Sequence, residues 1–121
     1  YIHIPFCAQK CAYCDFVSFA GACDEEEYID AVISDMKSYP ALDIDTVFIG
    51  GGTPSYISAG NIARLINEAG ECFYIKKDAE ITLESNPSSL SREKLQIYKS
   101  AGINRPSIRA GKRIKAAWAP A

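Results

Sequence analysis

Three cysteines near the start of the chain have a spacing that suits iron–sulfur chemistry. Cys7, Cys11 and Cys14 form a C-x3-C-x2-C cluster directly after a short apolar run. Thiolates are the natural ligands of a 4Fe-4S cluster, which ordinarily takes four of them. Three cysteines in one short loop can therefore hold a cluster and leave one iron without a protein ligand. That open iron could bind a substrate or a cofactor.

The cysteines have two other uses that remain open. With His3 they could form a Cys3His zinc site, which is a legitimate structural set. Zinc sites usually pair two-cysteine halves across a longer loop, so the iron–sulfur interpretation is favoured. Disulfides are disfavoured, because the chain has five cysteines, an odd number, and neither a signal peptide nor the cysteine density of a secreted scaffold. We expect Cys23 and Cys72 to be small buried thiols.

Two further segments could contact a small ligand. The run Gly50, Gly51 and Gly52 lacks side chains, so backbone N–H and C=O groups could approach a polar molecule closely. It matches neither a dinucleotide motif nor a phosphate loop, and a tight turn after a strand is the alternative. Glu84 ends an apolar run, where a buried carboxylate would need a partner. The alternative is an exposed loop acid.

Apolar runs that read as strands alternate with segments of helical period. The expected strands are residues 1–5, 46–49 and 81–84, and a fourth begins in 103–108. This alternation predicts an α/β fold with parallel strands and right-handed crossovers. Since His3 alternates with Ile2 and Ile4 in the first strand, we expect a packed, hydrogen-bonded histidine rather than a cluster ligand.

Capping signals mark three expected helices. Asp24 and the three glutamates after it crowd the first turn of one helix, where negative charge complements the macrodipole. Ser58 could cap a second helix that Gly70 ends. Ser91 starts a third, with a hydrophobic staple across its cap, and Gly102 ends it.

The candidate site residues all follow a predicted strand. The cysteine loop, the glycine run and Glu84 lie at the carboxyl ends of three consecutive strands. Folds of this class place their chemistry at those ends. The sequence therefore predicts one shared pocket.

The residues around these motifs resemble the radical S-adenosylmethionine (SAM) superfamily. The resemblance rests on HIPFC at residues 3–7, KCAYCDF at 10–16 and FIGGGTPS at 48–55. They look like the oxygen-independent coproporphyrinogen III oxidase group and, within it, the heme chaperones of the HemW type. The oxidase branch carries a further cysteine two residues after the third ligand, and here that position is Phe16.

This resemblance implies both cofactors and contacts. In the superfamily the amino and carboxylate groups of SAM chelate the open iron of a 4Fe-4S cluster, and an electron from the cluster cleaves SAM to a 5′-deoxyadenosyl radical. The fold it implies is the N-terminal half of a partial (β/α) barrel. The implied metal ligands are Cys7, Cys11 and Cys14, and the implied SAM contacts are Tyr1, Tyr13, Gly51, Gly52, Thr53 and Glu84. For the two tyrosines, a structural place in the barrel wall is the alternative.

The resemblance also implies a function. It indicates a heme chaperone that binds a 4Fe-4S cluster, SAM and heme, receives electrons from a donor and delivers heme to an acceptor protein. The alternative is an enzyme that oxidatively decarboxylates coproporphyrinogen III to protoporphyrinogen IX in porphyrin biosynthesis. Phe16 argues against the enzyme. A zinc-stabilised binding module would leave both later motifs unexplained.

The length and the last residues indicate a fragment. A closed (β/α)8 barrel needs ~250 residues, whereas this chain has 121. We expect an N-terminal piece that is inactive alone, with a partial core domain at residues 1–108 and an atypical basic tail at 109–121. Pro106, awkward in an interior strand, marks the point where the family pattern stops, as in a shifted reading frame or a truncation.

Charge and hydropathy exclude two classes of partner. Seven of the thirteen basic residues follow Glu93, but the tail has one aromatic residue, Trp118, and no nucleic-acid module. No apolar stretch reaches the ~20 residues that span a bilayer. We expect a soluble protein with reduced thiols, in the cytoplasm.

Overall fold

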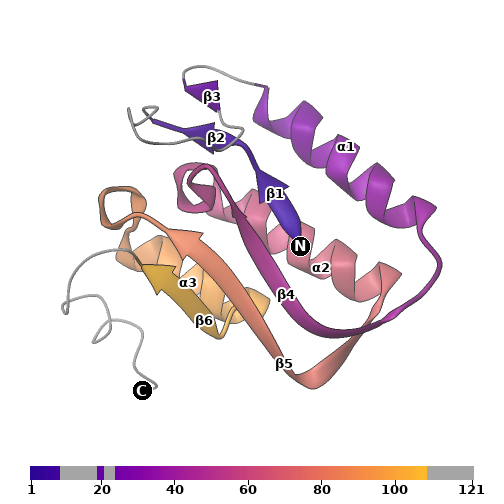
Figure 1. Ribbon diagram of the computed structural model, residues 1–121. Coiled ribbons are helices and arrows are strands. Elements are labelled where there is room, and N and C mark those ends of the chain that lie inside the picture. The colour runs from indigo at the N-terminus through magenta and orange to yellow at the C-terminus, as the bar shows by residue number, and fades with distance from the viewer. Residues whose placement is uncertain (9–18, 21–23, 109–121) are drawn as a thin grey trace.

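The computed structural model describes residues 1–8, 19–20 and 24–108. These residues form an α/β unit whose main sheet has four parallel strands in the order β1-β4-β5-β6 (Figure 1). The strands are β1 (Ile2–Ile4), β4 (Asp43–Gly51), β5 (Tyr74–Ser85) and β6 (Arg105–Ile108). The predicted fold class is confirmed.

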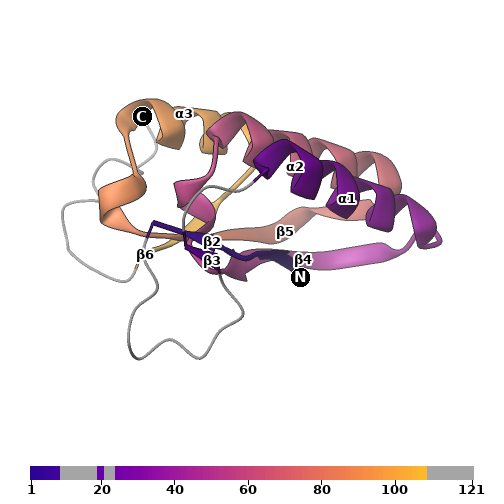
Figure 2. The same cartoon turned by 90° about the horizontal axis from the view of Figure 1, so that it is seen from above.

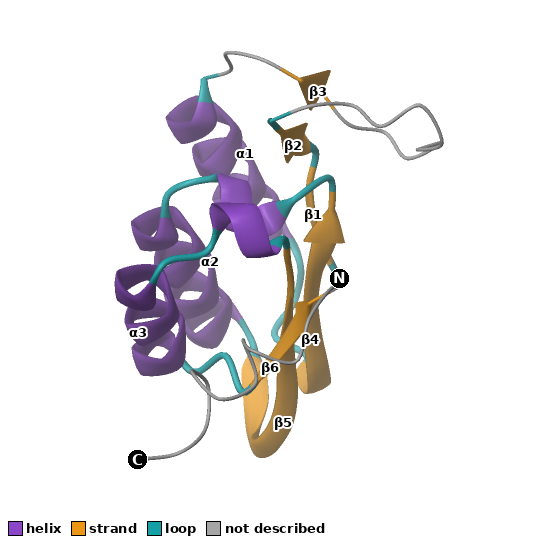
Figure 3. Ribbon diagram, turned by 90° about the vertical axis from the view of Figure 1, so that its left-hand side faces the viewer, coloured by secondary structure: helices purple, strands orange, loops and turns teal. Residues whose placement is uncertain are grey.

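Three helices connect these strands. They are α1 (Glu25–Ser38), α2 (Ala59–Cys72) and α3 (Arg92–Ala101). All three lie on one face of the sheet (Figures 2 and 3). Short 3-10 turns, η1 (Pro54–Tyr56) and η2 (Pro87–Ser89), follow β4 and β5, and a small parallel pair is formed by β2 (Phe6–Cys7) and β3 (Phe19–Ala20).

The core lies between the sheet and the helix layer. Side chains alternate across a strand, so one set on each strand faces the helices. Ile4, Ile49 and Leu83 belong to that set and are fully buried. On the helix side they meet Ile29 of α1 and Ile62 of α2 in a single hydrophobic cluster. In the described part of the chain, no helix covers the opposite face of the sheet.

Two helices begin, and one of them ends, where their signals predict. Asp24 is the N-cap of α1, and its Oδ1 accepts the N–H of Glu27 at 2.9 Å. Ser91 caps α3 by accepting the N–H of Lys94 at 3.1 Å. Gly102 ends α3 in the left-handed conformation, with φ of 106°.

The signals around α2 were misleading. Gly70 does not end the helix, which continues to Cys72. A helix-interior glycine costs only ~1 kcal/mol, and the burial of Ala69 beside it holds the last turn on the sheet. Ser58 stands at the N-cap, but its side chain makes no capping bond. Its N–H donates instead to the Glu25 carboxylate, at 3.1 Å to Oε1.

The two central strands start earlier than expected. The structure extends β4 back to Asp43 and β5 back to Tyr74. Their first residues are exposed and polar, so no apolar run marks them, but Ile44 and Ile75 pair across the ladder before a register shift at Thr46. Backbone pairing, rather than burial, makes these ends strands.

The fourth predicted strand is present despite its proline. Pro106 lies opposite Leu83 in the β5–β6 ladder. Within residues 24–108, β6 pairs on one side only, where a missing N–H is tolerated. The basic tail at 109–121 lies outside the described residues. None of the helices in the described part of the chain is long and apolar enough to cross a membrane.

Candidate functional site

The first and second predicted motifs meet through backbone hydrogen bonds. The N–H of Gly52 donates to the carbonyl of Ile4 at 2.7 Å, and the N–H of Thr53 donates to the carbonyl of Phe6 at 2.8 Å. These bonds lay the glycine run alongside β2, whose last residue is Cys7. The loop after β4 and the start of the cysteine loop are therefore one assembly.

Gly52 has to be a glycine because of this contact. A Cβ atom at this position would lie 2.6 Å from the Phe6 carbonyl oxygen and 2.8 Å from the Sγ of Cys7. The first of these neighbours is backbone and cannot rotate away. The absence of a side chain lets the loop touch the thiol that the sequence predicts to be a metal ligand.

Gly51 is constrained in two ways. Its φ is 119°, which side chains rarely adopt. An added Cβ would also lie 2.8 Å from the ring of His3 and 2.8 Å from the carbonyl oxygen of Ile4. Any larger residue would strain the backbone and displace β1.

Glu84 joins the third motif to the other two. Its Oε2 accepts the N–H of Gly51 at 3.2 Å. Glu84 is half-buried within β5 rather than in an exposed loop, so the carboxylate has the partner that its position requires. The structure brings Cys7, the glycine run and Glu84 together through these contacts, and that they line one shared pocket stays a prediction.

One expectation about the glycine run is wrong. We expected both N–H and C=O groups to be available to a ligand. The N–H groups of Gly51, Gly52 and Thr53 all donate within the protein. The carbonyl oxygen of Thr53 is used as well, because it accepts the N–H of Tyr56 at 2.8 Å. A ligand that bonds to the backbone of Gly51 or Gly52 would have to do so through a carbonyl oxygen.

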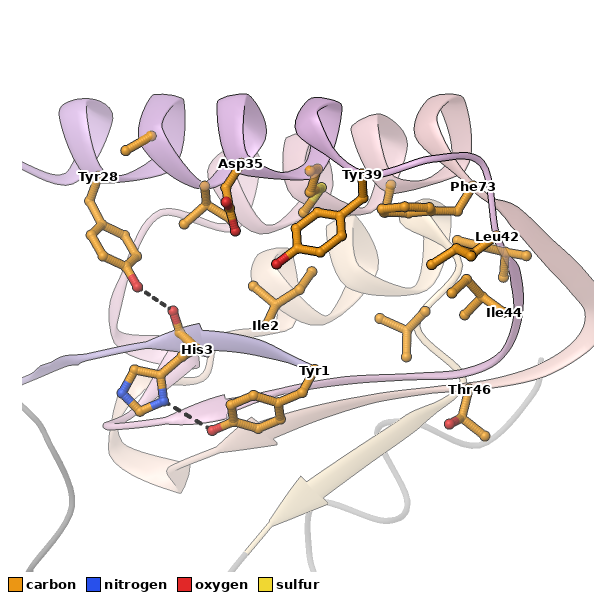
Figure 4. A pocket seen from close by; sticks show the side chains of 16 residues that line it. Tyr1, Ile2, His3, Tyr28, Asp35, Tyr39, Leu42, Ile44, Thr46 and Phe73 are labelled. Carbon is orange, nitrogen blue, oxygen red and sulfur yellow. Dashed lines mark hydrogen bonds between the residues drawn. The ribbon is translucent and has the colours of Figure 1, made fainter.

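Tyr1 and His3 lie on the face of β1 that points away from the helices, and Ile2 lies on the other (Figure 4). The Tyr1 hydroxyl is 3.0 Å from His3 Nδ1, and its ring stacks on Phe48 with centroids 5.9 Å apart. Although 76% of Tyr1 is exposed, its pKa is raised, first by partial burial of the hydroxyl and second by the charge of Glu84. His3 is packed and hydrogen-bonded, as predicted.

Tyr28 of α1 fixes the strand that leads into the cysteine loop. Its hydroxyl donates to the carbonyl of His3 at 2.6 Å, and its ring meets Phe6 edge-on with centroids 5.1 Å apart. Burial, and then Tyr1, raises the pKa of Tyr28. No sequence motif predicts this role, because Tyr28 lies within the expected helix and outside the motifs.

A groove of about 570 Å³ opens between α1, β1 and the first half of β4 (Figure 4). Its walls are mostly apolar, from side chains such as Met36, Ile44 and Phe73, and Tyr1 lies at its edge. Cys7, the glycine run and Glu84 do not line it. The groove is therefore separate from the place where the three motifs meet.

The other predicted ligands lie outside the described residues. Cys11, Cys14 and the predicted SAM contact Tyr13 fall in residues 9–18, as does Phe16. Within the described ranges, no three His, Cys, Asp or Glu side chains are grouped so that they could hold a metal ion. The two ends of the cysteine segment are nevertheless held side by side, because Cys7 pairs with Ala20 in the β2–β3 ladder.

The turn after β5 is closed by a local side-chain bond. Asn86 Oδ1 accepts the N–H of Ser88 at 3.1 Å, an Asx turn that starts η2. This turn lies against the loop after β4, since the N–H of Asn86 donates to Ser55 Oγ at 2.9 Å. It shapes the same end of the sheet.

Comparison with known proteins identifies the family. The sequence matches the pattern of the Radical SAM superfamily over residues 1–110. The chain belongs to the radical SAM superfamily. Membership implies SAM and an iron–sulfur cluster as cofactors, and the buried Cys7 beside a glycine loop is consistent with both.

Several relatives of this radical SAM chain carry the name heme chaperone HemW. One, from Buchnera aphidicola subsp. Schizaphis graminum, is 42% identical over 114 residues, and another, from Bacillus subtilis, is 41% identical over 114 residues. In each case the match covers 89% of this chain and 30% of the relative. The chain thus spans less than a third of the length of these relatives.

A solved radical SAM enzyme has a similar fold. It is the coproporphyrinogen III oxidase HemN from Escherichia coli, with a TM-score of 0.73 and 27% sequence identity. The similarity covers 89% of this chain and 26% of HemN. The predicted radical SAM fold is confirmed for the part of the barrel that the chain contains.

Proposed function

We propose that the chain holds a 4Fe-4S cluster on three thiolates and binds SAM at the carboxyl ends of its strands. The proposed ligands of the cluster are Cys7, Cys11 and Cys14, and the proposed contacts of SAM are Tyr1, Tyr13, Gly51, Gly52, Thr53 and Glu84. The observation that carries the proposal is the contact between Gly52 and Cys7, where a Cβ would meet Sγ at 2.8 Å. A predicted metal ligand and a predicted SAM loop are in direct contact.

The glycine run and Thr53, together called the glycine loop, carry hydrogen-bond acceptors that fit the amino group of SAM. An ammonium group has only donors, so it binds where carbonyl or carboxylate oxygens converge. The N–H groups of Gly51, Gly52 and Thr53 are used inside the protein, and the Thr53 carbonyl already accepts the N–H of Tyr56. A bond from this loop to the ammonium group would therefore come from the carbonyl oxygen of Gly51 or Gly52. Glu84 adds a carboxylate to the same place. An anion would find no free N–H group at these three positions.

In this proposal Glu84, Gly52 and Thr53 also position the glycine loop against the strand that carries Cys7. Glu84 fixes Gly51 through its N–H, and Gly52 and Thr53 fix the carbonyls of Ile4 and Phe6. A reduced cluster held by Cys7, Cys11 and Cys14 would supply one electron to SAM. The chain itself orients SAM and sets the distance between the loop and Cys7.

For the whole protein, we propose a heme chaperone of the HemW type. The name that its relatives carry at about 40% identity supports this proposal. Such a protein would bind heme, pass it to an acceptor protein and draw on an electron donor. Thiolate ligands need a reducing compartment, so we place it in the cytoplasm.

A second candidate is oxidative decarboxylation of coproporphyrinogen III. The fold similarity to HemN favours it, with a TM-score of 0.73. The HemW relatives are closer in sequence, at 42% against 27% identity, and Phe16 replaces the extra cysteine of the oxidase branch. We therefore rank the chaperone first.

Anaerobic incubation of the reconstituted full-length protein decides between the two. In one arm, heme is titrated and followed by its absorption spectrum. In the other, SAM, a reductant and coproporphyrinogen III are added and the porphyrins are analysed. The chaperone proposal predicts stoichiometric heme binding and no protoporphyrinogen. Protoporphyrinogen at many turnovers, absent from the Cys7→Ala variant, would favour the oxidase instead.

A further inference from the structure

A half-buried lysine holds the far side of the glycine loop. Lys94, in the first turn of α3, donates through Nζ to the carbonyl oxygens of Ser55 and Ile57, at 2.7 and 3.0 Å. Ser55 belongs to η1 and Ile57 is its C-cap. Carbonyls at the end of a helical turn lack partners in the turn, and a cation satisfies them well. Lys94 thus bonds η1 to α3, and η1 is separated from the glycine run by Thr53 alone.

The side chain of Ser55 makes a second connection on the same side. Ser55 is fully buried, and its hydroxyl lies 2.5 Å from Ser89 Oγ and accepts the N–H of Asn86 at 2.9 Å. The Ser89 hydroxyl also contacts the Asn86 carbonyl oxygen, at 3.0 Å. These bonds attach the loop after β4 to the loop after β5.

Partial burial of the Lys94 ammonium group has a free-energy cost, because the group loses part of its hydration. A long ammonium side chain on the first turn of a helix could extend into water, where it is best solvated. Lys94 is instead half-buried, and burial lowers its pKa, with Glu25 acting in the opposite direction. A group that is desolvated to hold two backbone oxygens restrains the segment that carries them.

The loop is therefore restrained at both ends. At one end, the N–H groups of Gly52 and Thr53 are bonded to β1 and to Phe6, next to Cys7. At the other end, two residues after Thr53, the carbonyl of Ser55 accepts a hydrogen bond from Lys94 of α3. The hydroxyl of Ser55 accepts the N–H of Asn86, directly before η2. A displacement of η1 would be transmitted through Thr53 to the strand that ends at Cys7.

We propose that Lys94 and Ser55 are positioning residues that hold the glycine loop against the cysteine strand in its SAM-binding geometry. Neither residue is required to touch the cofactors. This inference rests on the proposed function, because the geometry it explains is that of the proposed SAM site. It adds Lys94, from outside the sequence motifs, and gives a role to Ser55, the last residue of the FIGGGTPS segment; both residues determine SAM affinity.

Hydrogen exchange of the metal-free chain tests the restraint without any cofactor. Lys94→Met keeps most of the apolar stem and removes both bonds to carbonyl oxygen, and Lys99→Met on the exposed face of the same helix is the matched control. Hydrogen bonds from charged groups are worth enough that the amides of Gly52 and Thr53 should exchange about tenfold faster in Lys94→Met. The core amide of Leu65 should be unchanged. Equal rates at Gly52 and Thr53 in both variants would overturn the inference.

SAM titration of the reconstituted full-length protein tests the consequence. Lys94→Met should weaken SAM binding about tenfold at unchanged iron content, and Lys94→Arg, which can still donate to both oxygens, should restore it to within about threefold. Ser55→Ala should also weaken binding, whereas Ser58→Ala, an exposed serine without a capping bond, should not.

The outcomes separate the two proposals. If wild-type protein binds SAM and Lys94→Met binds it equally well, the positioning role is refuted and the proposed function stands. If wild-type protein with a full cluster does not bind SAM, the proposed function fails and this inference fails with it. In that case, faster exchange at Gly52 and Thr53 in Lys94→Met would show only that Lys94 restrains the loop, without any role in cofactor binding.

Discussion

Replacing Gly52 by alanine is the most informative single change in the chain. The added methyl group would point at the strand that carries Cys7. It would lie 2.6 Å from the Phe6 carbonyl oxygen and 2.8 Å from Cys7 Sγ. The same Phe6 carbonyl accepts the N–H of Thr53 at 2.8 Å. One methyl group therefore affects the backbone contact, the hydrogen bond and the predicted ligand together.

The size of the effect follows from these distances. Ordinary contact begins at 3.4 Å, so the methyl carbon is about 0.8 Å too close to a backbone oxygen. Overpacking of this kind typically costs ~1 to 3 kcal/mol. Weakening the hydrogen bond between Thr53 and Phe6 adds ~0.5 to 1.5 kcal/mol. We expect Gly52→Ala to lower the free energy of unfolding by ~1.5 to 4.5 kcal/mol, and to displace Cys7 from the loop.

The assay compares this variant with a glycine that has free space. An added Cβ at Gly70 would have no neighbour within 4 Å, and Gly70 lies inside α2. Alanine is preferred over glycine in a helix by ~0.8 to 1 kcal/mol. Urea titration of the metal-free chain, followed by circular dichroism, should therefore show a lower midpoint for Gly52→Ala and a higher one for Gly70→Ala.

Iron content after anaerobic reconstitution is the second reading of the same pair of variants. Gly52→Ala should take up less iron than wild type, and Gly70→Ala the same amount. A Gly52→Ala protein with the midpoint and iron content of wild type would refute the reasoning. It would mean that the contact between the glycine loop and Cys7 is not maintained in solution.

Two further predictions concern other parts of the molecule. Cys7→Ala should abolish reconstitution of the brown 4Fe-4S protein, whereas Cys72→Ala, a thiol packed at the edge of the core, should not; equal iron in Cys7→Ala, or stoichiometric zinc after anaerobic purification, would count against the cluster. Tyr98 is fully buried, its hydroxyl has no partner among the described residues, and burial raises its pKa from 10.0 to about 12. The pKa of Tyr98 is higher in the folded state than in the unfolded state. The free energy of unfolding therefore holds its full value below about pH 10 and falls by about 2 to 3 kcal/mol toward pH 12, as Tyr98 ionises more easily in the unfolded chain. Tyr98→Phe should flatten this fall in urea titrations at pH 7 and pH 11, and an unchanged slope would contradict the assignment.

The order of elements was predictable because each carries a local signal. Asp24, Ser91 and Gly102 mark helix ends through bonds that involve only neighbouring residues. The apolar runs in β4 and β5 mark the halves of those strands that the helices cover. Since parallel strands end at one edge of a sheet, the meeting of Cys7, Gly52 and Glu84 followed from the alternation alone.

The errors arise where distant contacts decide the structure. The helix α2 passes through Gly70 because the preceding Ala69 is buried, which no local rule reports. The exposed first residues of β4 and β5 become strand through pairing with each other. Lys94 has no motif, and its role depends on carbonyls 39 and 37 residues away in sequence.

Electron paramagnetic resonance of the reduced, reconstituted full-length protein, recorded with and without SAM, tests most directly whether the three loops form one cofactor site. SAM should shift the spectrum of the cluster in the wild-type protein. Gly51→Val, which strains a backbone at φ of 119°, and Glu84→Gln, which weakens the bond to the Gly51 N–H, should both require more SAM for the same shift. A spectrum that SAM does not change, or identical titrations for wild type and both variants, would show that the glycine loop and Glu84 do not belong to a SAM site.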